Sequence, residues 1–284
     1  MLLTLIISTT ILFLAAASYY DLKTGEIPDK ISIGLVAAIL ILSIFQALTE
    51  SPGFLINAVL FGTLYFAIGC ISFYFGHLGG GDVKLLAGIG CSVANIPAGS
   101  FIPDYLVYFI DAGIVVMPYM AIYGLILGFK NKTVFFEFAK EIRTLKIIMF
   151  ILLSFIPMFM LIFLAVNIEI VLIILCALLP VFVLLTIYLK IVEKKAMQRT
   201  IPVFELTKED TLAEDIIFEG EKIAKKNDVA GLTKEQVDKI KELAKGGRIP
   251  DKITIKWGIK FVPVLFIGFL IFVFYGNVIE VLFI

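Results

Sequence analysis

The sequence predicts an all-α polytopic membrane protein with about eight transmembrane helices and a small α+β cytoplasmic domain before the last helix. The first observation is composition, because 60% of the 284 residues are hydrophobic, whereas a soluble domain has about 45–50%. The second is that these residues gather in runs of roughly twenty, the length that a helix needs to cross a bilayer. The third is that Lys and Arg lie between alternate runs.

Eight apolar runs are candidate spans. They cover residues 2–20, 31–48, 54–75, 83–101, 105–129, 147–166, 170–189 and 259–275. The fourth run is rich in glycine and carries Lys84. The first run resembles a secretory signal, but Lys23 follows it, whereas a signal has its positive charge in front. We therefore expect residues 2–20 to remain as a helix.

The distribution of charge favours eight spans. One side of the membrane would then hold residues 21–30, 76–82, 130–146 and 190–258. The other would hold 49–53, 102–104, 167–169 and the C-terminal tail, and this side carries none of the 24 Lys and Arg residues. Because cytoplasmic loops are enriched in Lys and Arg, the first side is predicted to be cytoplasmic and both termini to lie outside.

Residues 191–256 are the only sizeable polar stretch. Alternating residues around 201–206 and 253–256 indicate short strands. Thr233-Lys234-Glu235-Gln236 is typical of a capping box and predicts a helix that continues to about Ala244 and ends at Gly246-Gly247. The sequence of residues 25–30, Gly-Glu-Ile-Pro-Asp-Lys, recurs at 247–252 with Arg in place of Glu. We interpret this recurrence as similar turn chemistry rather than as a duplication.

Two aspartates occupy the predicted cytoplasmic boundary. Asp21 ends the first span and Asp82 opens the fourth, so the topology predicts that they lie at one depth, where ionisable groups are costly and usually functional. Each alone could simply end or cap a helix. Two carboxyl groups a few ångströms apart cannot both ionise cheaply, so one retains its proton. Such a pair suits peptide hydrolysis, because one member activates water while the other donates to the scissile carbonyl.

The three glycines before Asp82 fit this chemistry. Gly79, Gly80 and Gly81 would let an extended substrate backbone approach closely. The start of a helix favours an ionised carboxylate, so on that argument alone Asp82 would be the base and Asp21 the acid.

These residues also carry a resemblance to a family. The segment Gly79-Gly80-Gly81-Asp82 matches the GxGD signature of membrane aspartic peptidases. With Asp21 and the Ile27-Pro28 that follows it, the pattern resembles the archaeal preflagellin and prepilin peptidases, relatives of the bacterial type IV prepilin peptidases. The match is firmest over residues 1–100, although residues 256–263, Lys-Trp-Gly-Ile-Lys-Phe-Val-Pro, are also similar to the segment before that family's last span.

The resemblance implies an enzyme of the cell membrane that cuts a short basic leader from pilin- or flagellin-like precursors near the cytoplasmic face. It implies a membrane peptidase core at 1–190 with its catalytic half at 1–101, a cytoplasmic domain at 191–256, and a last helix and tail at 257–284. Glu26 and Asp29, near Asp21, could attract the leader's Lys and Arg, or could be ordinary solvated charges. No cofactor is expected for this chemistry.

Metal, nucleic-acid and methyl-transfer functions are not predicted. The bacterial relatives typically carry paired cysteines that bind zinc and also methylate the new N-terminus, but Cys70, Cys91 and Cys176 form no CxxC pair and are expected to be packing residues. The net charge of zero gives no sign of a face for nucleic acid.

Other residues and functions stay open. His77 is expected to be a turn residue, and Asp111 to make a local hydrogen bond between helices. Lys84 is expected to extend to the cytoplasmic surface. Tyr20-Asp21 also matches the YD motif of the presenilin and signal-peptide-peptidase branch, but no Pro-Ala-Leu occurs. A transporter using intramembrane aspartates and a non-catalytic scaffold are the remaining alternatives.

Overall fold

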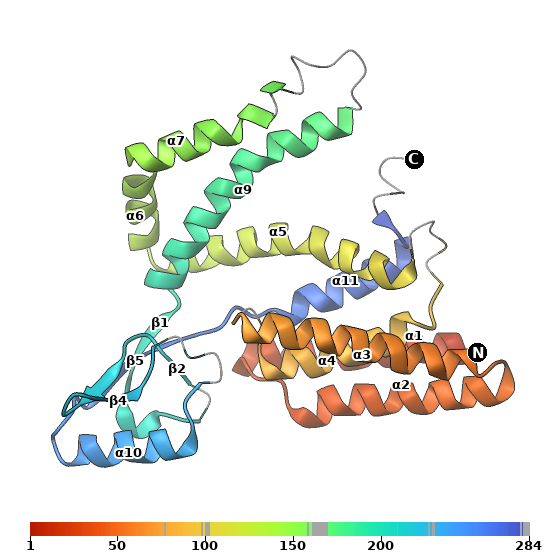
Figure 1. The fold of residues 1–284 in the computed structure, drawn as a ribbon, viewed down its shortest axis with the longest axis horizontal. Helices are drawn as coiled ribbons and strands as arrows, with labels where there is room; N and C mark the ends of the chain where they lie inside the picture. Colours follow the sequence, from red (N-terminus) through yellow and green to blue (C-terminus); the bar gives the residue numbers. More distant parts are fainter. Residues whose placement is uncertain are drawn as a thin grey trace. The chain divides into compact units, whose positions relative to one another are not determined.

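The computed structural model describes residues 1–76, 78–97, 99, 103–157, 159–160, 170–208, 210–226, 228, 231–278 and 280. The chain forms two compact units (Figure 1). Unit 1 comprises Met1–Met117, Asp228–Ala230 and Gly258–Ile284, and unit 2 comprises Pro118–Asn227 and Gly231–Trp257. His77, part of the fourth predicted span and the end of the sixth lie outside the described residues.

Unit 1 is built from helices of both chain ends. They are α1 (Leu2–Thr24), α2 (Asp29–Thr49), α3 (Gly53–Tyr74), α4 (Gly80–Val93), the first half of α5 (Asp104–Lys130) and α11 (Val262–Tyr275). Helix α4 packs on α1, α2 and α3, while α1 also packs against α11 (Figure 1). Tyr65 on α3 donates to the Tyr105 carbonyl at 2.7 Å, and Tyr108 donates to the Leu265 carbonyl at 3.2 Å, which ties α5 to α3 and α11.

Glycines allow α3 and α4 to approach closely. A Cβ on Gly90 of α4 would lie 2.5 Å from the Phe61 carbonyl oxygen and 2.7 Å from the Tyr65 ring. A Cβ on Gly69 of α3 would lie 3.2 Å from the Cα of Val83. Small residues at helix contacts are typical of membrane proteins, in which close backbone packing replaces the hydrophobic driving force between helices.

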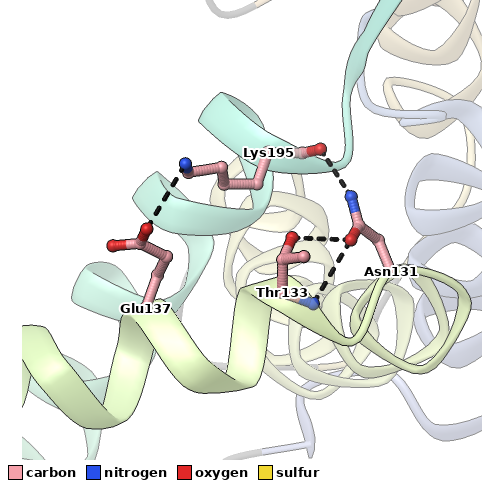
Figure 2. A network of polar contacts seen from close by, with 4 residues as sticks. All are labelled: Asn131, Thr133, Glu137 and Lys195. Carbon is pink, nitrogen blue, oxygen red and sulfur yellow. Dashed lines mark hydrogen bonds and ion pairs between the residues drawn. The ribbon is translucent and has the colours of Figure 1, made fainter.

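Unit 2 joins three helices to a small α+β region. The helices are α6 (Thr133–Ile142), α7 (Leu145–Ser154) and α9 (Ile170–Lys195), together with the second half of α5. Asn131, after α5, donates to the Lys195 carbonyl at 2.8 Å and accepts from the Thr133 hydroxyl at 2.6 Å. Lys195 also pairs with Glu137 at 3.4 Å. Figure 2 shows how these contacts tie the start of α6 to the end of α9.

The α+β region contains β1 (Gln198–Pro202), a 3-10 turn at Val203–Glu205, β2 (Thr211–Leu212), β3 (Ile216–Phe218), β4 (Glu221–Ala224), α10 (Lys234–Lys245) and β5 (Lys252–Lys256). Strand β5 lies between β1 and β2, with both pairings antiparallel. One face of α10 completes this core through Val237, Ile240 and Leu243.

The expected elements of this region are largely confirmed. The Thr233 hydroxyl accepts from Gln236 N and the Gln236 side chain accepts from Thr233 N, so the capping box opens α10 as predicted. The strand expected at 201–206 ends earlier, at Pro202, because proline has no N–H to continue a ladder. Gly25 and Gly247 both have positive φ, 82° and 66°, just after a helix, which confirms the similar turn chemistry of the two related segments.

The structure supports a multi-pass membrane protein with fewer long spans than predicted. Among the described residues, α1, α2, α3, α5 and residues 176–195 of α9 are long and apolar enough to cross a bilayer. The predicted spans at 83–101, 147–166 and 259–275 are not confirmed at that length. In their place lie α4 with 14 residues, α7 with 10 and α11 with 14. Helix α11 begins at Val262 because Pro263 favours the first turn of a helix.

Replacing Gly90 with alanine is expected to destabilise unit 1. The added methyl group would collide with the Phe61 carbonyl and the Tyr65 ring, and overpacking of this kind costs about 1–3 kcal/mol. Gly113→Ala on exposed α5 surface is the control, because its methyl group would meet nothing within 4 Å. Thermal unfolding in one detergent should show a lower midpoint for Gly90→Ala alone. Equal midpoints for the two variants would contradict the close α3–α4 contact.

Candidate active site

Asp21 lies in the last turn of α1 and is buried, with 5% of its surface exposed. Its Oδ2 atom accepts a hydrogen bond of 3.0 Å from the backbone N–H of Val262, the first residue of α11. The first N–H groups of a helix have no partner within the helix, and they carry the positive end of its dipole. Asp21 therefore satisfies one of these donors, and its carboxylate form is stabilised in return.

Lys260 adds a positive charge beside Asp21. Its Nζ lies over Gly25, since a Cβ built on that glycine would be 2.7 Å away. The Lys260 ammonium interacts electrostatically with Asp21. Gly25 has a φ of 82° and its N–H closes α1 by bonding to the Asp21 carbonyl. The turn that ends α1 therefore also leaves room for the Lys260 side chain.

Asp82 is the third residue of α4 and is half-buried. Its Oδ2 accepts a hydrogen bond of 2.9 Å from the N–H of Gly79, the residue that precedes the helix. This bond closes the first turn of α4 back onto the glycine segment. The side chain thus lies at a helix N-terminus, as Asp21 does, but here the helix is its own.

The structure places the two carboxyl groups within electrostatic range of each other. Helices α1 and α4 are in contact, and the charge of Asp21 acts on Asp82. Asp21 lies in the last turn of α1 and Asp82 in the first turn of α4, and Val262 at the start of α11 bonds to Asp21. One acidic pair, held by two helix N-termini, can pass a proton between its members and an adjacent water.

The three glycines before Asp82 differ in their surroundings. Gly81 packs against Ile27, because an added Cβ would lie 3.0 Å from the Ile27 Cβ. Gly79 and Gly80 are exposed, and a Cβ on Gly80 would meet nothing within 4 Å. The open backbone is therefore that of Gly79 and Gly80, whereas Gly81 accommodates a side chain of this chain. Their role toward a substrate stays a prediction.

The two acidic residues expected to bind a leader also differ. Asp29 forms an ion pair with Lys84, so Lys84 has a partner within the chain rather than only extending to the surface. This pair joins the start of α2 to the start of α4, close to Asp82. Glu26 is exposed, and its backbone N–H bonds to Thr24 Oγ1 at 3.3 Å.

Asp111 lies apart from the pair. It is fully buried in α5, and its Oδ1 accepts from the N–H of Val278 at 3.2 Å. Val278 follows the C-terminal end of α11, whereas Asp21 bonds the first residue of that helix. The 14 residues of α11 separate the two carboxyls by about 20 Å. The expected hydrogen bond of Asp111 is present, although its partner is a backbone N–H beyond the helix.

Sequence reasoning missed Lys260 and Val262 as neighbours of Asp21. Residues 256–263 were noted for their resemblance to a family segment, but nothing local in them indicates a contact with a helix more than 230 positions earlier in the chain. In the part of the chain that the structure describes, no cluster of three or more His, Cys, Asp or Glu residues could hold a metal ion.

Comparison with known proteins gives a family and one relative. A model of the type IV leader peptidase family matches residues 8–198. The chain is similar to prepilin peptidase EppA of Methanothermobacter thermautotrophicus, with 23% identity over 94% of this chain and 93% of the relative. No solved structure matches significantly. The matched region contains both Asp21 and Asp82 and extends over two thirds of the chain, and we conclude that the protein belongs to the type IV leader peptidase family.

Proposed function

We propose that the protein is a membrane aspartic endopeptidase that removes the short basic leader of preflagellin- or prepilin-like precursors. The observation that carries this proposal is that Asp21 and Asp82 interact electrostatically where α1 and α4 are in contact. The family match supports leader processing in general. The carboxyl pair supports the aspartic mechanism, for which Asp21 and Asp82 are the residues that we propose.

The chemistry follows from a pair that shares one proton. The ionised carboxylate takes a proton from water, and the resulting hydroxide attacks the scissile carbonyl carbon. The protonated carboxyl donates to the carbonyl oxygen as negative charge develops there. Collapse of the tetrahedral intermediate breaks the C–N bond. The leaving amine receives the proton that was taken from water, and the hydroxyl formed from the carbonyl oxygen returns its proton to the carboxylate that had donated it. The pair returns to its starting charge, so each cut consumes one water.

The membrane face of the site is inferred from charge. The end of unit 1 that holds Asp21 and Asp82 also carries Lys23, Lys30 and Lys84. Cytoplasmic segments are enriched in Lys and Arg, so in this proposal the pair lies near the cytoplasmic face and both termini outside. Residues 1–190 then form the membrane core, 191–256 a cytoplasmic domain and 257–284 the last helix and tail.

The substrate would present an extended strand to the exposed glycine backbone. Gly79 and Gly80 have no side chains to obstruct it, and they lie directly before Asp82. Glu26 lies in the turn after α1 and could contact the basic residues of a leader, whereas the Asp29 carboxylate is already paired with Lys84.

Replacing either aspartate with asparagine should abolish cleavage. Asparagine keeps the shape but can neither accept nor deliver the required proton, and loss of acid–base catalysis costs at least about a hundredfold in rate. The measurement is shortening of a pilin-like precursor by the purified protein in lipid vesicles. Asp111→Asn is the matched control, because Asp111 is also buried but lies at the other end of α11. Full activity in Asp21→Asn or Asp82→Asn would reject the pair mechanism.

Replacing Glu26 with glutamine should weaken binding of a basic leader. We expect KM to rise about two- to fivefold at low salt, because an exposed charge pair contributes little and is screened. The effect should shrink at high salt and vanish for a precursor whose leader has lost its Lys and Arg. Glu50→Gln, at the far end of α2, is the control. An unchanged KM in Glu26→Gln would remove this residue from leader recognition.

A further inference from the structure

We propose that Lys260 and the first turn of α11 hold Asp21 as the ionised member of the pair, so that Asp21 activates the water and Asp82 is the acid. This inference rests on the proposed function and reverses the order that the sequence alone favours. Lys260 contacts neither water nor substrate in this account. It acts through Asp21 and is a positioning residue.

The surroundings of Asp21 combine three stabilising contacts for a carboxylate. The Val262 N–H donates to its Oδ2 at 3.0 Å. That N–H lies in the first turn of a 14-residue helix, whose dipole favours a negative charge there. The Lys260 ammonium, above Gly25, supplies a full positive charge. All three contributions come from residues 260–275, near the opposite end of the sequence.

The surroundings of Asp82 are less favourable to a negative charge. It has a comparable N–H donor, Gly79 at 2.9 Å, and a comparable place at a helix start. The nearest cation on its own helix is Lys84, which pairs with Asp29. The helix and hydrogen-bond contributions are similar for both aspartates, and burial disfavours a negative charge at both, whereas the Lys260 cation acts on Asp21.

Several elements contribute charged side chains around the end of α1. From α4 come Asp82 and Lys84, and from the start of α2 come Asp29 and Lys30. Residues Val262–Tyr275 of α11 carry no charged side chain, and the segment just before this helix supplies Lys260. The α1 end itself contributes Lys23, whose Nζ lies 5.5 Å from the Tyr19 ring centre, and the turn after it contributes the exposed Glu26.

A carboxylate at Asp21 requires Lys260 to be a cation. If Lys260 served packing alone, a neutral side chain of similar length would replace it. If Lys260 instead stabilises the Asp21 carboxylate, removing Lys260 would leave more of Asp21 protonated. The protonated, inactive form of the enzyme would then persist to a higher pH. The two roles therefore differ in the pH dependence of cleavage and in the division of the effect between kcat and KM.

The test compares Lys260→Gln and Lys260→Arg in the full-length protein in lipid vesicles, with Lys30→Gln as control, since Lys30 is an exposed cation at the same end. The substrate is a pilin-like precursor with a basic leader. We expect Lys260→Gln to lower kcat by up to about tenfold on the acidic side of the pH profile, with KM changed less than twofold. The pH below which cleavage fails should move upward by about one unit. Lys260→Arg should keep both values within about twofold of the unmodified protein.

Three results would overturn the role of Lys260. A normal kcat and pH profile in Lys260→Gln, or the same loss in Lys30→Gln, would overturn the assignment of Lys260. A loss that arginine fails to restore would also overturn it, because the charge would then not be what matters. If Lys260→Gln unfolds, Lys260→Met is judged by the same two readouts after its thermal midpoint is shown to be normal. An unmodified protein that cleaves no precursor would instead reject the proposed function itself.

Discussion

The hydrogen bond from the Val262 N–H to Asp21 joins the first and last helices of the chain and fixes one half of the candidate site. A buried carboxylate needs donors to compensate for lost water, and a helix N-terminus needs acceptors for its first N–H groups. At this contact the Val262 N–H gains an acceptor and the Asp21 carboxylate gains a donor. The segment that supplies Val262 also brings Lys260 beside Asp21. The position of this carboxyl, and in our proposal also its charge, therefore depends on residues outside the region that the family model matches, which ends at 198.

The second half of the site depends on close packing rather than on a long-range polar contact. Helix α4 has only 14 residues and lies among α1, α2 and α3. Gly69 and Gly90 allow α3 and α4 to approach until backbone atoms nearly touch. This packing determines where α4 begins, and Asp82 is the third residue from that beginning. The Asp29–Lys84 pair and the contact of Ile27 with Gly81 secure the same end from the side of α2.

Sequence reasoning predicted the acidic pair because both aspartates lie at the boundaries of apolar runs. Two predicted spans, 31–48 and 54–75, separate them, which returns the chain to the same side of the bilayer. It predicted the α10 capping box and the turn at Gly25 because each depends on a few neighbouring residues. It predicted a fourth span of 83–101 where α4 ends at Val93, because hydropathy records composition but not where a buried helix stops. It also favoured Asp82 as the base, since the dipole of α4 is evident from sequence. The contribution of α11 to Asp21 is not evident from sequence, because it depends on a contact between residues 21 and 262, which lie far apart in the chain.

The most direct test of the account is whether positions 21 and 82 meet in the membrane-embedded protein. Asp21→Cys and Asp82→Cys can be combined after Cys70, Cys91 and Cys176 are replaced by serine or alanine, and treated in membranes with a short bifunctional thiol reagent. The reference pair is Asp21→Cys with Asp111→Cys, about 20 Å apart along α11. The account predicts an intramolecular cross-link, mapped by peptide mass, in the first pair and none in the second. A cross-link in the reference pair alone would contradict it. The absence of a cross-link in both pairs, although each cysteine reacts with the reagent, would contradict it as well.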